Sequence, residues 1–344
     1  MKKIILSALA LIGALTLNAQ DDAPKLSVSG TVDAYYQTYL TAPDDATVSF
    51  GTSFADEAGF ALGMANLVLS YDGEKTGVVA DLVYGPRGDS AAGGYNLNQL
   101  YAYWNVSETT TLTAGRFNTY LGYEVISPAG NFNYSTSYLF SNGPFSHVGL
   151  KADFALGEDF SLMLAVMNPT DTNNNTTGDY GLGAQLGYAG QYLNLYYDND
   201  SVLGFEIDYT GGFDITDDFF LGINAAYQIK PTNEVEEVLG EDGELIDEEY
   251  EYEGGFAGVA LYPQYSVSDS FALGLRGEYF VKHGDTDEPS VFATTLTGSY
   301  TVENLTIKPE IRLDAWSDNE PYVDADSVAS ESLGAFTIAA IYSF

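Results

Sequence analysis

Charged residues alternate with apolar residues along several segments of the chain. In segment 305–314 (LTIKPEIRLD), every second residue from Thr306 to Asp314 is polar or charged. Segment 271–282 (FALGLRGEYFVK) repeats the pattern with Arg276, Glu278 and Lys282. Because successive side chains of a β-strand point to opposite faces, these charges share one face of each strand. Charged side chains on the inner face of a closed sheet could act on ions that pass through it.

The same parity predicts which residues line the interior of such a sheet. Asp33, Asp81 and Lys282 belong to this set. Arg116 lies on a less regular segment and is included with them. The expected pore lining is Arg116, Glu124, Lys151, Asp153, Glu206, Asp208, Arg276, Glu278, Lys308, Glu310, Arg312 and Asp314.

Two arrangements of the lining charges are compatible with the pattern. Arg276, Lys308 and Arg312 could form a basic wall, or each could pair with an acidic neighbour: Glu278, Glu310 or Asp314. Both signs recur at the same depth, so we favour mixed pairing, which stiffens the wall.

Residues suited to catalysis or cofactor binding are scarce. The chain has no cysteine and two histidines, His147 and His283. Ser146 adjoins His147, but neighbouring residues of a strand point to opposite faces, so they do not form a hydrolase pair. Nucleotide-binding glycine motifs and zinc motifs are absent from the sequence. We expect no enzyme activity, no cofactor and no metal centre.

The net charge excludes one class of partner. Twelve Lys and Arg face 49 Asp and Glu, giving a formal charge of -37, which repels nucleic acid. Segment 234–253 (EVEEVLGEDGELIDEEYEYE) holds much of the acid and predicts a solvated, mobile loop. Its spacing does not match a calcium-binding loop, so loose bridging by divalent cations is the more plausible interaction. Such an acidic entrance concentrates cations.

The N-terminus predicts export. Lys2 and Lys3 precede an apolar run over 4–17, and Ala19 offers a cleavage site, so we expect a signal peptide over 1–19 and a single domain over 20–344. The alternative, a retained membrane helix, is disfavoured by the short span. No other stretch is long and apolar enough for a membrane helix, so any membrane span must be a β-strand.

Strand-like segments and their connectors indicate an all-β fold. Sixteen segments of alternating polarity are separated by turns, which is typical of a transmembrane, antiparallel, up-and-down β-barrel. The alternation of connectors predicts short periplasmic turns and long acidic extracellular loops. The short connectors are 72–76, 107–110, 157–159, 189–191, 215–218, 267–270 and 303–304; the others are 41–57, 85–95, 119–146, 168–178, 199–202, 231–253, 283–289 and 317–330.

Aromatic residues add two further signals. Aromatic residues near the strand ends predict the two girdles that lie at the membrane–water interfaces of a barrel. We assign to these girdles Tyr71, Tyr84, Trp104, Tyr188, Phe271, Tyr279, Tyr300 and Trp316. In the last segment, Phe336, Ile338, Ala340, Tyr342 and Phe344 form one outward row. Tyr342 and Phe344 look like the C-terminal signal read by the barrel-assembly machinery. This last strand is expected to close against 26–40.

Four short stretches resemble a known family. They are GRF at 115–117, GYE at 122–124, NFNYSTSY at 131–138, and Gly143-Pro144 followed by HVG at 147–149. They resemble the OmpL-like β-barrel porin family of Bacteroidetes. The resemblance implies a bacterial outer-membrane porin embedded in lipid, and suggests a Bacteroidetes source. It carries no motif for a particular solute.

Segment 119–146 is too long for a simple connector and is rich in aromatic residues. It could fold into the lumen as a constriction, or pack outside as a lid. With the acidic charge, these features predict passive diffusion of ions and small hydrophilic solutes with a preference for cations. The alternative is an occluded structural or adhesive barrel that binds partners through its extracellular loops. A homotrimer is expected by analogy with other sixteen-strand porins.

Overall fold

The computed structural model describes residues 25–45, 48–199, 203–239, 245–284 and 288–344, and the side chains of these ranges except 231–253. The signal peptide expected over 1–19 lies outside the described residues. No helix in the described ranges is both long and apolar enough to cross a membrane.

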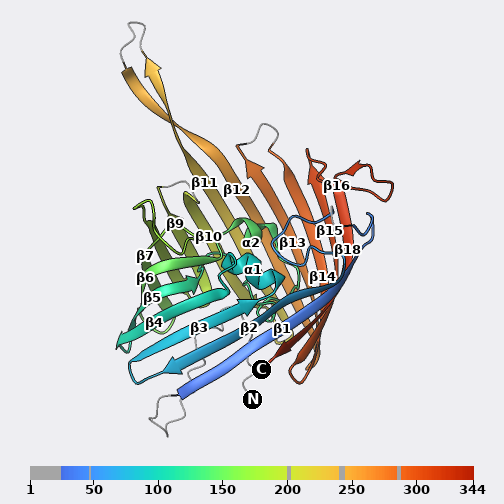
Figure 1. Cartoon of the computed structure of the whole chain (residues 1–344), viewed down its shortest axis with the longest axis horizontal. Coiled ribbons are helices and arrows are strands. Elements are labelled where there is room, and N and C mark those ends of the chain that lie inside the picture. The colour runs from blue at the N-terminus through green and yellow to red at the C-terminus, as the bar shows by residue number, and fades with distance from the viewer. Residues whose placement is uncertain (1–24, 46–47, 200–202, 240–244, 285–287) are drawn as a thin grey trace.

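Sixteen antiparallel strands form one closed barrel (Figure 1). The predicted fold class and strand number are thereby confirmed. In chain order the barrel strands are β1 (Lys25–Tyr39), β2 (Gly59–Asp72), β3 (Thr76–Tyr84), β4 (Leu97–Ser107), β5 (Thr110–Asn118), β6 (Ser146–Ala155), β7 (Phe160–Met167), β8 (Gly181–Tyr188), β9 (Gln191–Tyr197), β10 (Phe205–Asp214), β11 (Phe219–Leu239), β12 (Leu245–Ser268), β13 (Phe271–His283), β14 (Ser290–Val302), β15 (Leu305–Ser317) and β18 (Ser332–Ser343). A separate pair, β16 (Tyr322–Val323) and β17 (Ala329–Ser330), lies in the connector between β15 and β18.

The first and last strands close the barrel. Thr31 of β1 is opposite Ser343 of β18, and Tyr39 is opposite Ala335. Gly30 and Phe344 exchange two backbone hydrogen bonds of 3.0 Å. Closure leaves no unpaired sheet edge, which is the condition for a sheet to sit in lipid.

The alternation of side chains follows the predicted parity. On β15, Glu310 and Arg312 are each 2% exposed, whereas Ile311 and Leu313 are about half exposed. Trp316 is the exception to the predicted girdle: it is 8% exposed and its ring donates a hydrogen bond to Tyr322. The prediction for Trp316 was wrong because Trp316 shares the inward parity of Arg312 and Asp314.

Connectors 73–75, 108–109, 189–190, 269–270 and 303–304 are short, and the connectors that alternate with them in the chain are mostly longer. The hairpin of β11 and β12 departs from the prediction. Its strands continue to Leu239 and restart at Leu245, so most of the expected 231–253 loop has an extended, paired backbone. Backbone pairing does not depend on side-chain charge, which is why the acidic run did not reveal it. Figure 1 shows this hairpin rising far beyond the barrel rim.

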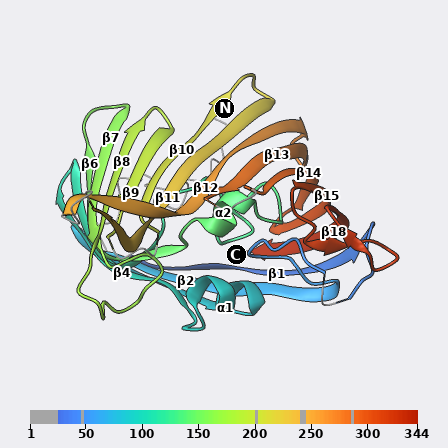
Figure 2. The ribbon, with the colours of Figure 1, turned by 90° about the horizontal axis from the view of Figure 1, so that it is seen from above.

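Two short helices belong to the longer connectors. In α1 (Pro86–Ala92), Pro86 occupies the first turn, where a missing N–H costs nothing, and Gly93 ends the helix in the left-handed conformation. In α2 (Tyr138–Asn142), the Ser137 side chain caps the helix by accepting a hydrogen bond from the Phe140 N–H. Figure 2, which looks down on the barrel, shows α2 within the ring of strands.

Candidate functional site: the barrel interior

Segment 119–145 crosses the interior of the barrel. On one side, the Tyr120 hydroxyl donates to the Leu195 carbonyl of β9 at 2.6 Å. On the other side, the Tyr134 hydroxyl donates to Asp33 of β1 at 2.6 Å, and the Tyr134 N–H donates to Glu310 of β15 at 2.8 Å. Contacts with both walls favour a position in the lumen over an outer lid, the two alternatives that the sequence left open.

Glycines on the inner face of the wall make room for the aromatic rings of this segment. A Cβ on Gly222 of β11 would collide with the Tyr123 ring, and one on Gly274 of β13 would collide with the Phe132 ring. A Cβ on Gly183 of β8 would meet the Tyr120 hydroxyl at 2.5 Å. The wall and the segment are therefore complementary in shape.

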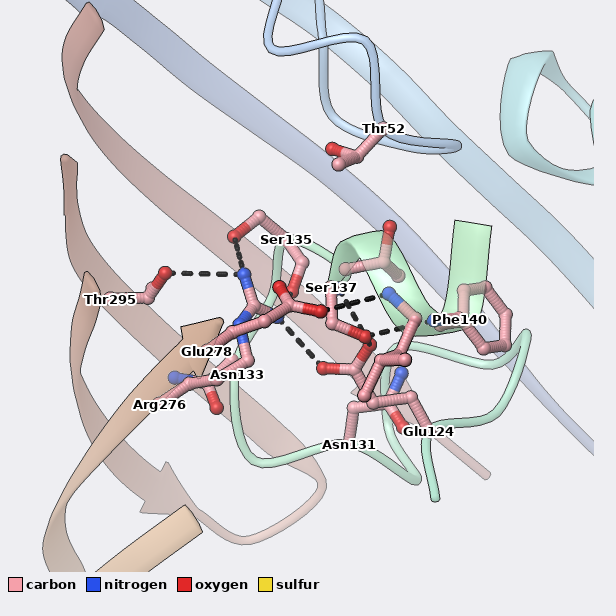
Figure 3. A network of polar contacts seen from close by, with 12 residues as sticks. Thr52, Glu124, Asn131, Asn133, Ser135, Ser137, Phe140, Arg276, Glu278 and Thr295 are labelled. Carbon is pink, nitrogen blue, oxygen red and sulfur yellow. Dashed lines mark hydrogen bonds and ion pairs between the residues drawn. The ribbon is translucent and has the colours of Figure 1, made fainter. Parts of the chain in front are cut away.

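Arg276 of β13 lies at the centre of a polar network, shown in Figure 3. Its guanidinium forms an ion pair with Glu124 at 2.7 Å and donates to the Ser135 carbonyl at 2.7 Å and to the Thr295 hydroxyl at 3.1 Å. Both partners of the ion pair are almost fully buried. A buried ion pair keeps its charges only while both partners are present, and removing one partner typically costs about 3–5 kcal/mol.

Glu278, two residues further along β13, holds the start of α2. Its carboxylate accepts the N–H groups of Tyr138 at 3.0 Å and Leu139 at 2.8 Å. These N–H groups belong to the first turn of a helix and have no partner within it. Glu278 therefore serves the inserted segment and does not pair with Arg276.

Arg312 of β15 joins a second inserted segment, 48–58, to the wall. It pairs with Asp314 at 2.7 Å and donates to the Thr52 hydroxyl at 3.0 Å and to the Thr136 carbonyl at 3.1 Å. Its guanidinium lies 4.2 Å from the centre of the Phe50 ring, a cation–π contact that is strengthened by burial.

The predicted mixed pairing is therefore only partly correct. Of the three proposed pairs, Arg312–Asp314 is formed. Lys308 instead donates to the carbonyls of Pro128, at 3.0 Å, and Asn131. Glu310 accepts from the backbone of Tyr134 and from the Thr297 hydroxyl. The sequence could not supply these partners, because they belong to a segment far away in the chain.

The pattern of alternation also missed Arg87, which lies in α1. Its guanidinium donates to the carbonyls of Ile126, at 3.3 Å, and Tyr134, at 2.9 Å. It also lies over the rings of Phe54 and Tyr134. Arg87 thus ties the 85–96 connector to the other two inserted segments. No strand periodicity marks it in the sequence.

The remaining predicted lining residues lie nearer the β4 to β10 wall. Arg116 donates to the Asn98 carbonyl at 3.0 Å and contacts Asn173. Lys151 and Asp153 of β6 form a partly exposed ion pair of 2.9 Å. Glu206 and Asp208 of β10 are buried beneath segment 119–145.

The two histidines are not arranged for hydrolysis. The His147 ring contacts the Thr119 hydroxyl at 3.0 Å and stacks near Tyr196, whereas the Ser146 hydroxyl donates to Asp171. His283 contacts the Gln228 carbonyl at 2.8 Å. Within the described ranges, Ser146 and His147 have no hydrogen bond to each other that could activate a nucleophile.

Comparison with solved structures shows the same architecture in outer-membrane channels. The chain is similar to the outer-membrane channel DcaP of Acinetobacter baumannii (TM-score 0.60, 14% identity, 94% of this chain and 99% of that chain). It is also similar to an anion-selective porin from Comamonas acidovorans (TM-score 0.61, 11% identity, 94% of this chain and 100% of that chain). A third similar structure is Salmonella typhi OmpF in complex with daunomycin (TM-score 0.59, 13% identity, 94% of this chain and 98% of that chain). At these identities the likeness concerns the fold.

A search of curated proteins gave no match. The family model described as "Putative beta-barrel porin-2, OmpL-like" matches residues 25–344. Its match covers the whole barrel, including the four stretches on which the resemblance rests. The chain therefore belongs to this OmpL-like porin family, and it is a β-barrel of the bacterial outer membrane.

Proposed function

We propose that this porin lets ions and small hydrophilic solutes diffuse passively, with a preference for cations. The observation that carries the proposal is the charge of the barrel's buried residues. Among the described residues, buried carboxylates outnumber buried Lys and Arg side chains by nine to five. An excess of fixed negative charge around a pore lowers the energy of cations within it and raises that of anions, also where inserted segments cover the charged groups.

The inserted segments would narrow the route. Arg276, Glu278, Lys308, Glu310, Arg312 and Asp314 are covered by segments 48–58 and 119–145, whereas Lys151 and Asp153 keep partly exposed side chains. The proposed lining of an open path is therefore the β5 to β6 side of the lumen. A narrow path would pass ions and small solutes and exclude large ones.

A reversal-potential measurement across a planar bilayer tests the preference. The mature protein is inserted between dilute KCl solutions of unequal concentration, and we expect a potential of the sign given by K⁺ permeation. A potential of the opposite sign would reject cation preference. Liposome swelling with neutral sugars of increasing size measures the width of the path. The anion selectivity of the Comamonas acidovorans porin does not predict the result, because selectivity depends on lining residues rather than on fold.

An occluded structural or adhesive barrel is the second candidate. Three inserted segments pack into the lumen, and Tyr134 and Arg276 are fully buried there. In that case the extracellular loops would bind a partner. A purified barrel that inserts into bilayers but never conducts, under any voltage, would favour this candidate over the porin.

The fold and family point to a non-enzymatic channel. A homotrimer is a further proposal, supported by the trimer form of Vibrio cholerae OmpT, which has a TM-score of 0.54 to this chain at 9% identity. Light scattering of the detergent-solubilised protein would give the mass of the complex. A mass of a single chain would reject the trimer.

A further inference from the structure

Two buried carboxylates share one inner face of β10. Glu206 is 2% exposed and Asp208 is 1% exposed, and both line a cavity of about 10 Å³ together with Asn224. A cavity of this size has room for about one water molecule. Leu121, Leu139 and Phe140 also line it, so an apolar part of segment 119–145 covers the two carboxylates.

The two carboxylates differ in their hydrogen bonds. Asp208 accepts from the Asn194 amide at 2.6 Å, the Gly122 N–H at 3.0 Å and the Asn224 amide at 2.5 Å. The Oε2 atom of Glu206 is buried and has no hydrogen-bond partner among the described residues. An unpaired, buried carboxylate oxygen carries the full cost of lost hydration.

No ion pair with a described Lys, Arg or His side chain balances the charge of these two carboxylates. Of the other carboxylates buried beside the segment, Glu124 and Asp314 each face a guanidinium at 2.7 Å. Asp33, Glu278 and Glu310 accept hydrogen bonds from the segment itself. Neither Glu206 nor Asp208 takes part in an ion pair within the part of the chain that the structure describes. Two like charges side by side in an apolar enclosure are stabilised by a positive charge between them or by protonation of one of them.

We propose that the cavity binds one dehydrated monovalent cation, of the size of Na⁺ or K⁺, between Glu206 and Asp208. The Glu206 Oε2 atom and the carboxylate of Asp208 supply the charge, and the Asn224 side chain completes the polar lining. This site deepens the proposed cation preference, and its part in permeation rests on that proposed function.

The size of the cavity favours a dehydrated monovalent ion over a hydrated divalent one. Mg²⁺ keeps several of its water molecules, and Ca²⁺ takes six to eight oxygen ligands. A cavity of about 10 Å³ leaves no room for a hydrated ion. A proton on Glu206 is the competing way to remove its charge, and a water molecule in the cavity would then accept from the protonated Oε2 atom.

Anomalous diffraction tests the site. Crystals of the mature barrel are grown in Tl⁺ in place of Na⁺ and K⁺, and we expect an anomalous peak in the cavity. Glu206→Gln, which keeps the shape and removes the charge, should lower the Tl⁺ occupancy at least about tenfold. Asp214→Asn is the matched control, because Asp214 lies on β10 with the same parity but is exposed.

Several outcomes would overturn the proposal. They are an ordered water or an empty cavity in the wild type, an unchanged peak in Glu206→Gln, or occupancy by Mn²⁺ but not by Tl⁺. The first of these outcomes is read from the wild-type crystal alone, so the proposal can still be rejected if the Glu206→Gln variant fails to fold.

A solution measurement complements the crystal. The thermal midpoint of the wild type should be higher in NaCl than in N-methylglucamine chloride at equal ionic strength, and Glu206→Gln should lose this difference while Asp214→Asn keeps it. Neither readout requires conduction. If Tl⁺ binds in the cavity but the barrel never conducts, the proposed channel function is rejected and the proposed cation site is kept. If the barrel is a cation-preferring channel but no Tl⁺ binds in the cavity, the cation site is rejected and the channel function is kept.

Discussion

Phe132 lies over Gly274, and this contact tests the docking of segment 119–145 at the scale of one residue. Gly274→Ala would place a Cβ where the Phe132 ring now lies. We expect it to destabilise the protein by about 1–3 kcal/mol, the usual cost of overpacking. Gly277→Ala, three residues along β13, is the control, because nothing lies within 4 Å of its added Cβ. Equal midpoints of guanidinium unfolding for the two variants would contradict the docked arrangement.

Asp56 gives segment 48–58 a dependence on pH. Burial raises the pKa of Asp56 to about 7, although the Arg312 guanidinium lowers it. Between pH 3.8, the ordinary value, and pH 7, the docked segment holds a proton that the released segment has lost. The contribution of Asp56 to docking is therefore most favourable below pH 4 and weakens as the pH rises to about 7.

Asp56→Asn should remove this weakening, because an amide does not ionise. The chain has no cysteine, so a Thr52→Cys background reports docking through the rate of thiol labelling. At pH 8 we expect labelling to be several-fold slower when Asp56→Asn is added to this background than when Asp56 is kept. Comparison at one pH cancels the effect of pH on the thiol itself. Equal rates would show that Asp56 does not control the docking.

At the scale of elements, segment 119–145 acts as one inserted unit. Deleting Ser127 to Asn142 removes the backbone partners of Lys308 and Glu278 and leaves their charges to water, which can hydrate them in a wider lumen. We expect a higher single-channel conductance. Shortening the exposed connector by deleting 174–178 is the control and should leave it unchanged. An unaltered conductance in the first variant would reject the constriction.

The terminal strand carries a prediction about assembly. Phe344 is 53% exposed on the outer face, in the row of Ile338 and Tyr342. Its backbone hydrogen bonds to Gly30 do not require an aromatic side chain. Phe344→Ser should therefore leave the stability of the refolded protein nearly unchanged. Because the change removes the aromatic residue of the proposed assembly signal, it should lower the amount of barrel in the outer membrane by several-fold. Equal amounts in isolated outer membranes would reject the assembly role.

The strands were predictable from the sequence because their signal is local. Lipid on one side and the lumen on the other impose a period of two, so Arg312 and Ile311 reveal their faces without knowledge of their neighbours. Trp316 was misassigned because aromatic character outweighed parity. The partners of Arg276 and Arg87 were not predictable, since Glu124, Ser135 and Tyr134 reach them only through the path of a long inserted segment.

At the scale of the whole molecule, the net charge of -37 includes two groups of acidic residues that respond differently to salt. The acidic segment 234–253 belongs to the hairpin that rises beyond the rim. Inside the barrel, the described buried carboxylates outnumber the buried Lys and Arg side chains by four. Charges in open water act over about 30 Å at 0.01 M salt and about 3 Å at 1 M. Buried charges are screened much less.

This difference predicts how the ion preference changes with salt. The permeability ratio of K⁺ to Cl⁻ should fall between 0.01 M and 1 M KCl and still remain above one, because the lumenal carboxylates keep their effect. Replacing Glu236, Glu237, Glu248 and Glu249 by Gln should lower the ratio in dilute salt and leave it unchanged at 1 M. If the ratio fell equally at both concentrations, the hairpin charges would have to act within the lumen itself, and the separation of outer from inner charge would be wrong.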